Sequence, residues 1–219
     1  MPIYPPRVKI CCIASREEAR LAISYGASAL GLVASMPSGP GPIDDSLIFE
    51  IARTIPPPIG SFLLTSETKA ANIILHQQRT HTNTIQLVDE LEEKAYGRIR
   101  ASLPAVRIVQ VIHVLNEASI DEALEIVPFA DALLLDSGNP KLDVKQLGGT
   151  GRVHNWKLSR KIVEQSSIPV FLAGGLNESN VKAAMQEVGP FGLDLCSGVR
   201  TGGKLDERKL ENFMKLVYN

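Results

Sequence analysis

Cysteine, net charge and long apolar runs are all scarce in this chain, and each scarcity excludes a class of protein. Its 219 residues include three cysteines, two of them adjacent, which are too few for a disulfide framework and lack the spacing of a zinc site. The 23 basic and 24 acidic residues leave a net charge of −1, which gives no electrostatic reason to expect nucleic acid or an anionic membrane as a partner. No apolar run is long enough to span a bilayer, and the first six residues lack the basic and apolar regions of a signal peptide. We therefore expect a cytoplasmic protein that binds neither nucleic acid nor membrane.

Apolar segments typical of strands alternate with amphipathic segments typical of helices along the whole chain. The strand candidates are residues 8–13, 29–33, 59–64, 84–88, 106–113, 130–135, 170–173 and 192–196, and the helix candidates are residues 16–25, 45–54, 67–78, 90–100, 117–127, 157–165, 178–187 and 206–217. A repeat of roughly 25 residues suits βα units and a parallel sheet. Eight such units predict a closed (β/α)8 TIM barrel, with residues 1–219 forming a single domain. A doubly wound sheet is the alternative, although it would rarely need eight evenly spaced units.

Two short turns rich in small residues follow the seventh and eighth predicted strands. Gly174 and Gly175 follow the seventh strand, and Ser197 and Gly198 follow the eighth. Turns at these two places of a (β/α)8 barrel bind phosphate through their backbone N–H groups. We therefore predict a phosphorylated small molecule as the ligand of these turns. Tight packing of the turns, with no ligand, is the alternative.

Two longer connections, residues 35–42 and 137–155, follow the second and sixth predicted strands, and both would lie at the carboxyl face of a barrel. In the second of them, Gly149, Thr150 and Gly151 are predicted to contact the phosphorylated ligand, because glycine lets the backbone approach an anion closely. His154, near the end of the same connection, could be a surface residue or a ligand contact. No metal is expected, since the other histidines show no mutual ligand spacing.

Two side chains at predicted strand ends could carry acid–base chemistry. Asp136 closes an apolar run, and a carboxyl at the mouth of an apolar barrel is partly desolvated, which raises its pKa and lets it donate a proton. Cys11 ends the first strand in phase with Lys9, whose positive charge would favour the reactive thiolate. The alternatives are an aspartate that caps its own loop and an inert, buried thiol. Inert packing is the preferred prediction for Cys12 and Cys196.

Five motifs occur in a family-specific order: Lys9-Ile10-Cys11, the run ending at Asp136, residues 148–151, residues 173–176, and Ser197-Gly198-Val199. With them the chain resembles the phosphoribosylanthranilate isomerase family over about residues 8–217. The resemblance implies a barrel enzyme of tryptophan biosynthesis that needs no metal or organic cofactor and acts as a monomer or homodimer. It also implies an Amadori rearrangement of N-(5′-phosphoribosyl)anthranilate, with Cys11 as the base that takes the C2′ proton and Asp136 as the acid that protonates the ring oxygen. The glycine turns and Lys9 would hold the sugar phosphate.

The chain departs from the family pattern around the part of the site that would hold the anthranilate group. Cys12 replaces a glycine, and residues 37–42 lack the arginine that pairs with the anthranilate carboxylate. Such a charge-assisted pair is worth ~1.5–3 kcal/mol, or roughly one to two decades of affinity. Arg200, which replaces an acidic residue, or Arg152 could supply the cation from another loop. A non-catalytic or altered-specificity sugar-phosphate-binding paralogue stays open as an alternative, and so does another phosphate-handling barrel enzyme such as an epimerase or aldolase.

Overall fold

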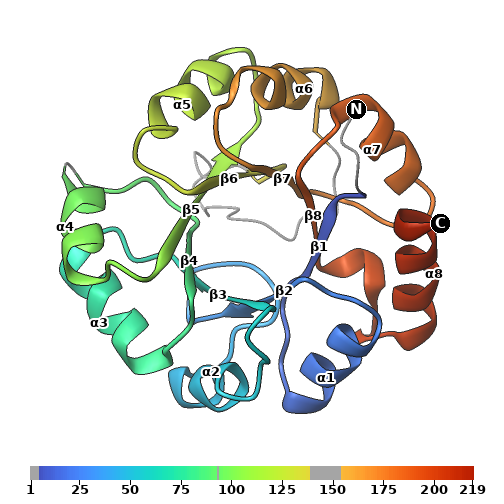
Figure 1. Ribbon diagram of the computed structural model, residues 1–219, viewed down its shortest axis with the longest axis horizontal. Coiled ribbons are helices and arrows are strands. Elements are labelled where there is room, and N and C mark those ends of the chain that lie inside the picture. The colour runs from blue at the N-terminus through green and yellow to red at the C-terminus, as the bar shows by residue number, and fades with distance from the viewer. Residues whose placement is uncertain (1–4, 93, 139–153) are drawn as a thin grey trace.

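The computed structural model describes residues 5–92, 94–138 and 154–219. Within these residues, eight parallel strands close into one barrel in the order β1 to β8, with helices α1 to α8 around it (Figure 1). The strands are β1 (Arg7–Ile10), β2 (Ala29–Val33), β3 (Gly60–Thr65), β4 (Thr84–Leu87), β5 (Arg107–His113), β6 (Ala132–Asp136), β7 (Val170–Leu172) and β8 (Gly192–Leu195). The helices are α1 (Arg16–Ser24), α2 (Asp45–Ala52), α3 (Ala70–Thr80), α4 (Ala95–Ser102), α5 (Ala118–Ile126), α6 (Trp156–Gln165), α7 (Val181–Val188) and α8 (Glu207–Tyr218). The predicted (β/α)8 barrel is confirmed.

Three helix starts follow from local capping chemistry, because the side chains of Ser15, Asn155 and Asp206 cap α1, α6 and α8. The hydroxyl of Ser15 accepts a hydrogen bond from the N–H of Glu18 and so begins α1 as predicted. Three predicted starts are three or more residues early. The helix expected from residue 67 begins at Ala70. The helix expected over residues 90–100 begins at Ala95, because Lys94 has a left-handed backbone with φ of 61° that a right-handed helix cannot include. The helix expected from residue 178 begins at Val181, because the residues before it form a turn held by asparagine side chains.

The last βα connection carries extra structure. After β8 the chain forms a 3-10 turn, η1 (Ser197–Val199), and then a small antiparallel ribbon of β9 (Arg200–Thr201) and β10 (Lys204–Leu205). This ribbon leads into α8, which is capped by the side chain of Asp206. Among the described residues, no helix combines the length and apolar character that crossing a membrane would require.

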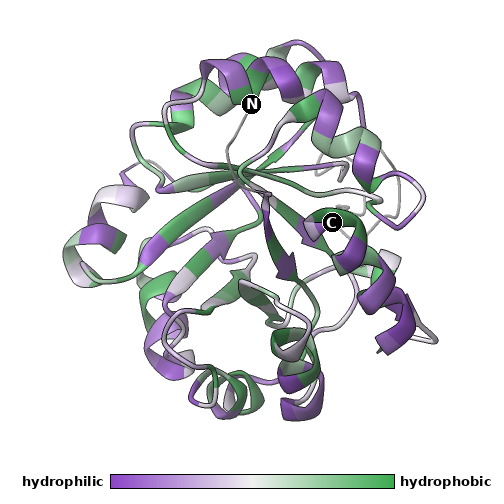
Figure 2. Ribbon diagram, turned by 45° about the vertical axis from the view of Figure 1, so that its right-hand side comes forward, coloured by the Kyte–Doolittle hydropathy of each residue, from purple (hydrophilic) through white to green (hydrophobic). Residues whose placement is uncertain are grey.

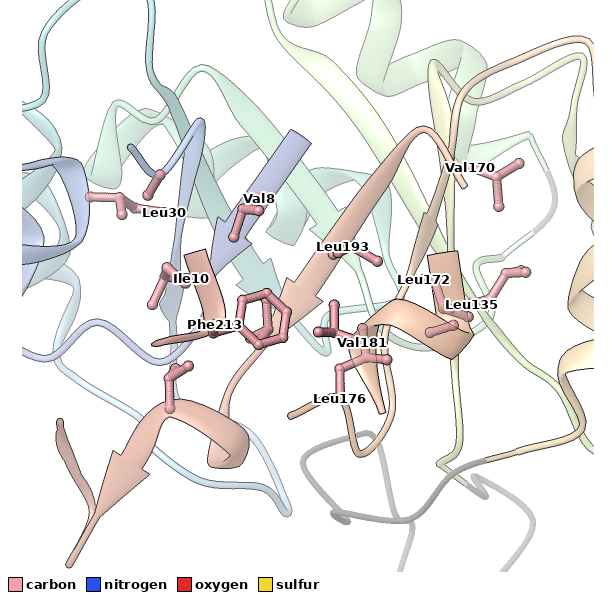
Figure 3. Close-up of a cluster of buried hydrophobic side chains, with 14 of the residues drawn as sticks. Val8, Ile10, Leu30, Leu135, Val170, Leu172, Leu176, Val181, Leu193 and Phe213 are labelled. Atoms are coloured by element: carbon pink, nitrogen blue, oxygen red, sulfur yellow. The ribbon is translucent and has the colours of Figure 1, made fainter. Parts of the chain in front are cut away.

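Side chains alternate between two apolar layers, as the twofold period of a strand requires. The outer layer lies between strands and helices, and Figure 3 shows Val8 and Ile10 of β1 together with Phe213 of α8 in this layer. The helices carry hydrophobic and hydrophilic residues in alternation, as amphipathic helices do (Figure 2). The inner layer fills the barrel and includes Phe62 and Phe171, whose rings meet edge to face. The interior of the barrel is therefore mainly apolar, and the buried pair of Lys9 and Asp194 is an exception to this.

Candidate active site

A pocket opens at the carboxyl ends of the strands, and we refer to it as the mouth pocket. Its walls come from the ends of β1 to β8 and from the loops that follow β2, β7 and β8. The lining residues are Cys11, Cys12, Val33, Met36, Ser38, Gly39, Pro40, Leu64, Gln86, Val88, Val111, Leu134, Asp136, Ala173, Gly174, Gly175, Leu176, Asp194, Cys196 and Ser197. The pocket therefore combines an apolar floor with two titratable groups predicted from the sequence, Cys11 and Asp136.

Cys11 reaches the mouth pocket because the β1–β8 pairing continues one residue past β1. The N–H of Cys11 donates to the carbonyl oxygen of Leu195, with N and O 2.7 Å apart. Gly31 of β2 makes room beside it, since a Cβ on Gly31 would lie 2.9 Å from Cys11 Sγ and 3.0 Å from Lys9 Nζ. The thiol and the ammonium therefore pack over the same glycine, and a thiolate at Cys11 would be attracted by the charge of Lys9.

Lys9 is fully buried inside the barrel and does not line the mouth pocket. Its Nζ lies 2.8 Å from Asp194 Oδ1 and 5.3 Å from the centroid of the Phe62 ring. Burial would lower the pKa of Lys9, but the adjacent Asp194 carboxylate outweighs it and holds that pKa above its ordinary value. Lys9 is thus a buried, charged neighbour of Cys11, and its predicted contact with substrate stays a prediction.

Asp136 ends β6 and is only 6% exposed, although it lines the mouth pocket. Its Oδ2 accepts a hydrogen bond from the N–H of Gly138 at 2.9 Å. Burial raises the pKa of Asp136, against the opposing effects of nearby His113 and of backbone N–H groups. A carboxyl in this environment keeps its proton to higher pH, which is what a general acid needs.

Cys12 belongs to the inner apolar layer and Cys196 packs against it, in line with the packing role predicted for both, and their inertness stays a prediction. Cys12 has φ of 62°, and this left-handed residue breaks the strand alternation so that Cys12 lines the pocket beside Cys11. Its Sγ lies 2.7 Å from the Sγ of Cys196, which also lines the pocket. The hydrogen bond from Cys12 lowers the pKa of the Cys196 thiol, and contacts with Cys11 and Cys196 raise the pKa of the Cys12 thiol. The sequence resemblance could have flagged position 12, where a glycine suits the left-handed φ.

The two predicted phosphate turns meet at the edge of the mouth pocket. Gly174 and Gly175 have φ of 83° and 65°, and the carbonyl of Gly175 accepts hydrogen bonds from the side chains of Asn177 and Asn180. A Cβ on Gly198 would collide with the carbonyl oxygen of Leu176, so the turn after β8 packs directly on the turn after β7. Gly174, Gly175 and Ser197 line the pocket, whereas Gly198 makes this close packing possible.

Arg200 does not enter the mouth pocket but binds the backbone of the turn that lines it. Its guanidinium pairs with Glu18 and donates to the carbonyl oxygens of Cys11 and Cys12, and it does not line the mouth pocket. Burial would raise the pKa of the Glu18 carboxyl, but the hydrogen bonds from Arg200 and from backbone N–H groups outweigh burial and lower that pKa. Arg200 thus holds the turn that carries Cys11, and its predicted contact with substrate stays a prediction. The remaining predicted residues, Gly149, Thr150 and Gly151, lie outside the described residues, as does Arg152.

Two polar side chains at the mouth were not predicted to have a role. Gln86 of β4 lines the pocket at 3% exposure, and its Oε1 has no hydrogen-bond partner among the described residues. His113 ends β5 in register with Asp136 and places its Nε2 3.3 Å from the carbonyl oxygen of Val88. A polar residue inside an otherwise apolar strand was the available signal for both. The described residues hold no cluster of three or more side chains that could bind a metal ion.

A closed barrel of eight parallel strands, with a thiol, a buried carboxyl and two glycine turns around one pocket at its carboxyl mouth, defines a (β/α)8-barrel enzyme site suited to acid–base chemistry. The family model for N-(5′-phosphoribosyl)anthranilate (PRA) isomerase matches residues 8–216. The chain belongs to the N-(5′-phosphoribosyl)anthranilate isomerase family.

Individual relatives agree with this assignment over nearly the full chain. N-(5′-phosphoribosyl)anthranilate isomerase 2 of Methanosarcina mazei is 34% identical over 215 residues, which are 97% of this chain and 94% of the relative. The isomerase of Haloarcula marismortui is 32% identical over 211 residues, or 95% and 94% of the two chains. The crystal structure of the Thermotoga maritima isomerase superposes with a TM-score of 0.83 at 28% identity, covering 97% of this chain and 98% of that one. A further isomerase structure, in complex with reduced 1-(o-carboxyphenylamino)-1-deoxyribulose 5-phosphate, gives a TM-score of 0.80 at 26% identity, with coverage of 97% and 98%.

Proposed function

We propose that this protein isomerises N-(5′-phosphoribosyl)anthranilate in tryptophan biosynthesis, with Cys11 as the general base and Asp136 as the general acid. The isomerase activity follows from membership of the family and from the full-length relatives. The observation that supports the residue roles is that both side chains line the same pocket from different strands. Between β1 and β6, on the shorter way round the barrel, lie β7 and β8, which carry the glycine turns. A sugar phosphate held by those turns would therefore lie between acid and base.

The reaction then needs one proton donor and one proton acceptor. Protonation of the ribose ring oxygen by Asp136 breaks the C1′–O4′ bond and opens the ring, leaving a protonated imine between C1′ and the anthranilate nitrogen. The imine acidifies the C2′ hydrogen, and the Cys11 thiolate removes that proton to give an enolamine. Tautomerisation of the enolamine to the ketone completes the rearrangement. Each proton-transfer residue contributes typically ~10²–10⁴-fold to such a rate.

Lys9 and Arg200 take supporting roles in this proposal. The buried ammonium of Lys9 stabilises the Cys11 thiolate through space, since the two groups pack over the same glycine. Arg200 fixes the turn by binding the carbonyls of Cys11 and Cys12. The phosphate would be held by Gly174, Gly175 and Ser197, with Gly198 packing the two turns together. The predicted phosphate contacts of Gly149, Thr150 and Gly151 lie outside the described residues.

The anthranilate ring would occupy the part of the mouth pocket bordered by the loop after β2. Met36, Gly39 and Pro40 line that side. The ring would therefore be bound there by apolar contact and not by an ion pair with an arginine of this loop. The relatives do not favour the alternative of a non-catalytic or altered-specificity paralogue. We also propose a monomer or homodimer in the cytoplasm, which keeps thiols reduced and so suits the unpaired cysteines.

A fluorescence assay of the purified protein tests the proposal. Anthranilate fluorescence reports consumption of N-(5′-phosphoribosyl)anthranilate, and we expect turnover that saturates with substrate. A protein that binds phosphate esters by calorimetry and leaves this substrate unchanged would contradict the proposed function. The double variant Cys11→Ser/Asp136→Ala is the background control, because it removes both proposed proton-transfer groups.

A further inference from the structure

The mouth pocket contains a thiol pair that the proposed reaction does not use. Cys12 and Cys196 come from opposite ends of the chain, and their Sγ atoms lie 2.7 Å apart. A disulfide has an S–S distance of ~2.05 Å, so a movement of roughly 0.7 Å would bring the two sulfurs to bonding distance. Cys12 and Cys196 follow the adjacent strands β1 and β8, and the hydrogen bond from the Cys11 N–H to the Leu195 carbonyl holds the two backbones beside each other.

The loop after β2 is shaped around the Cys12 side chain. A Cβ on Gly41 would lie 2.7 Å from the Cβ of Cys12, so any larger residue at position 41 would displace it. The carbonyl oxygen of Pro40 lies 3.5 Å from Cys12 Sγ on the other side, as a second and weaker acceptor for the single thiol proton. The thiol is therefore held in place from two sides and directed at Cys196.

The charges around the pair favour different protonation states on its two sulfurs. Hydrogen bonding from Cys12, together with the positive charges of Arg200 and Lys9, lowers the pKa of the Cys196 thiol. The pKa of the Cys12 thiol is raised by its sulfur neighbours and by burial. A low-pKa thiolate beside a second thiol is the arrangement in which a first oxidation is followed by capture of the oxidised sulfur.

We propose that Cys12 and Cys196 form a redox-modification site in the mouth pocket, which a hydroperoxide converts to a disulfide and a small thiol restores. In the first step the Cys196 thiolate attacks one peroxide oxygen, the O–O bond breaks, and the leaving oxygen takes a proton to give water or an alcohol. The product at Cys196 is a sulfenic acid. In the second step the Cys12 sulfur attacks Cys196 Sγ, the S–O bond breaks, and the hydroxyl leaves as water with the proton from Cys12. The two sulfurs together lose two electrons, which the peroxide accepts.

Peptide mapping of the purified, full-length protein tests this site without any measurement of catalysis. Its result is therefore independent of whether the proposed function is correct. The reduced protein is treated with hydrogen peroxide, free thiols are alkylated with iodoacetamide, and the trypsin digest is analysed by mass spectrometry. We expect peptides 10–16 and 183–200 to be joined, with the mass of two hydrogens lost. Fragment ions should place the bond on Cys12 and the alkyl group on Cys11, and dithiothreitol should release both peptides.

Matched variants decide which sulfurs react. Cys11→Ser should still form the cross-link, whereas Cys12→Gly and Cys196→Ser should not. Glycine suits the left-handed φ at position 12, so Cys12→Gly removes the thiol without new backbone strain. A cross-link through Cys11, a sulfinic acid on Cys196 without a cross-link, or three alkylated thiols after excess peroxide would each overturn the proposal. Should Cys11→Ser not fold, the fragment ions of the wild-type protein still assign the bond.

Discussion

Lys9 and Asp194 form an ion pair inside the barrel, with Nζ and Oδ1 2.8 Å apart and the lysine side chain fully buried. The pair follows from strand register, because the β1–β8 pairing places the two residues opposite each other. Removing one partner of such a pair leaves an uncompensated buried charge, whereas removing both leaves none.

We therefore expect Asp194→Leu to lower the free energy of unfolding by about 3–5 kcal/mol. The double variant Lys9→Met/Asp194→Leu should be distinctly more stable than the single variant. The pKa of Lys9 is raised in the folded state. The stability that the protonated lysine contributes in the wild type is therefore present in full below the ordinary pKa of 10.5, and it is lost as pH rises through the pKa of the folded state. Urea unfolding of the three proteins measures these differences, and equal destabilisation of the single and double variants would contradict a charge effect.

Cys11→Ser and Asp136→Ala should each lower kcat by at least ~10²-fold, because each removes one proton-transfer group. Asp121→Ala is the matched control, since this exposed carboxyl of α5 lies outside the mouth pocket. The circular dichroism spectrum of each variant should stay close to that of the wild type, which shows that the fold is kept. Near wild-type turnover in either variant would remove that residue from the mechanism.

Asp136→Asn should abolish turnover. Its free energy of unfolding should exceed that of the wild type by an amount that grows as pH rises. The pKa of Asp136 is raised on folding, so its favourable contribution is present below the ordinary value of 3.8 and is lost as pH rises through the folded value. Asparagine stays neutral and can still accept the bond from Gly138. Urea midpoints of both proteins at pH 4 and pH 8 measure the effect, and a difference between them that does not grow with pH would refute it.

The sequence alone placed Cys11 and Asp136 at the barrel mouth because both inferences rest on local rules. Alternation along a strand decides which side chains share a face, and the carboxyl ends of parallel strands meet at one end of a barrel. The same rules put Lys9 on the inner face with Cys11. They could not reveal that Asp194, which lies 185 positions further along the chain, would be its partner.

Other features of the site depend on contacts that no local pattern encodes. The left-handed turn at Cys12 brings its thiol into the pocket, although strict alternation points it the other way. Arg200 was a candidate for the missing cation because the sequence showed only its charge, and its bonds to Glu18 and to the Cys11 carbonyl appear only in the fold. Gln86 resembles any polar residue in a strand until its neighbours are known.

Gln86→Leu should raise KM for the substrate by up to about tenfold while leaving the protein at least as stable as the wild type. The Oε1 of Gln86 has no partner among the described residues and lines the pocket, so we expect a substrate N–H or O–H to donate to it. One hydrogen bond is worth a net ~0.5–1.5 kcal/mol, and an unpaired buried acceptor costs roughly 1–3 kcal/mol. Steady-state kinetics and urea unfolding separate the two roles. A loss of stability with unchanged KM would show that Gln86 serves only the packing of the barrel.

His154, just before α6, should make the fold sensitive to mild acid. Its Nε2 lies 2.7 Å from Ser159 Oγ, and burial lowers the pKa of His154 from 6.5 to about 4. A histidine with a depressed pKa contributes stability that is present above pH 6.5 and is lost as pH falls through the folded value, in total roughly 3–4 kcal/mol. His154→Gln keeps a polar group of similar size but cannot take up a proton. Unfolding in urea at pH 7 and pH 4 should therefore show a smaller acid-induced loss in the variant than in the wild type, and equal losses in both would show that other groups govern the acid response.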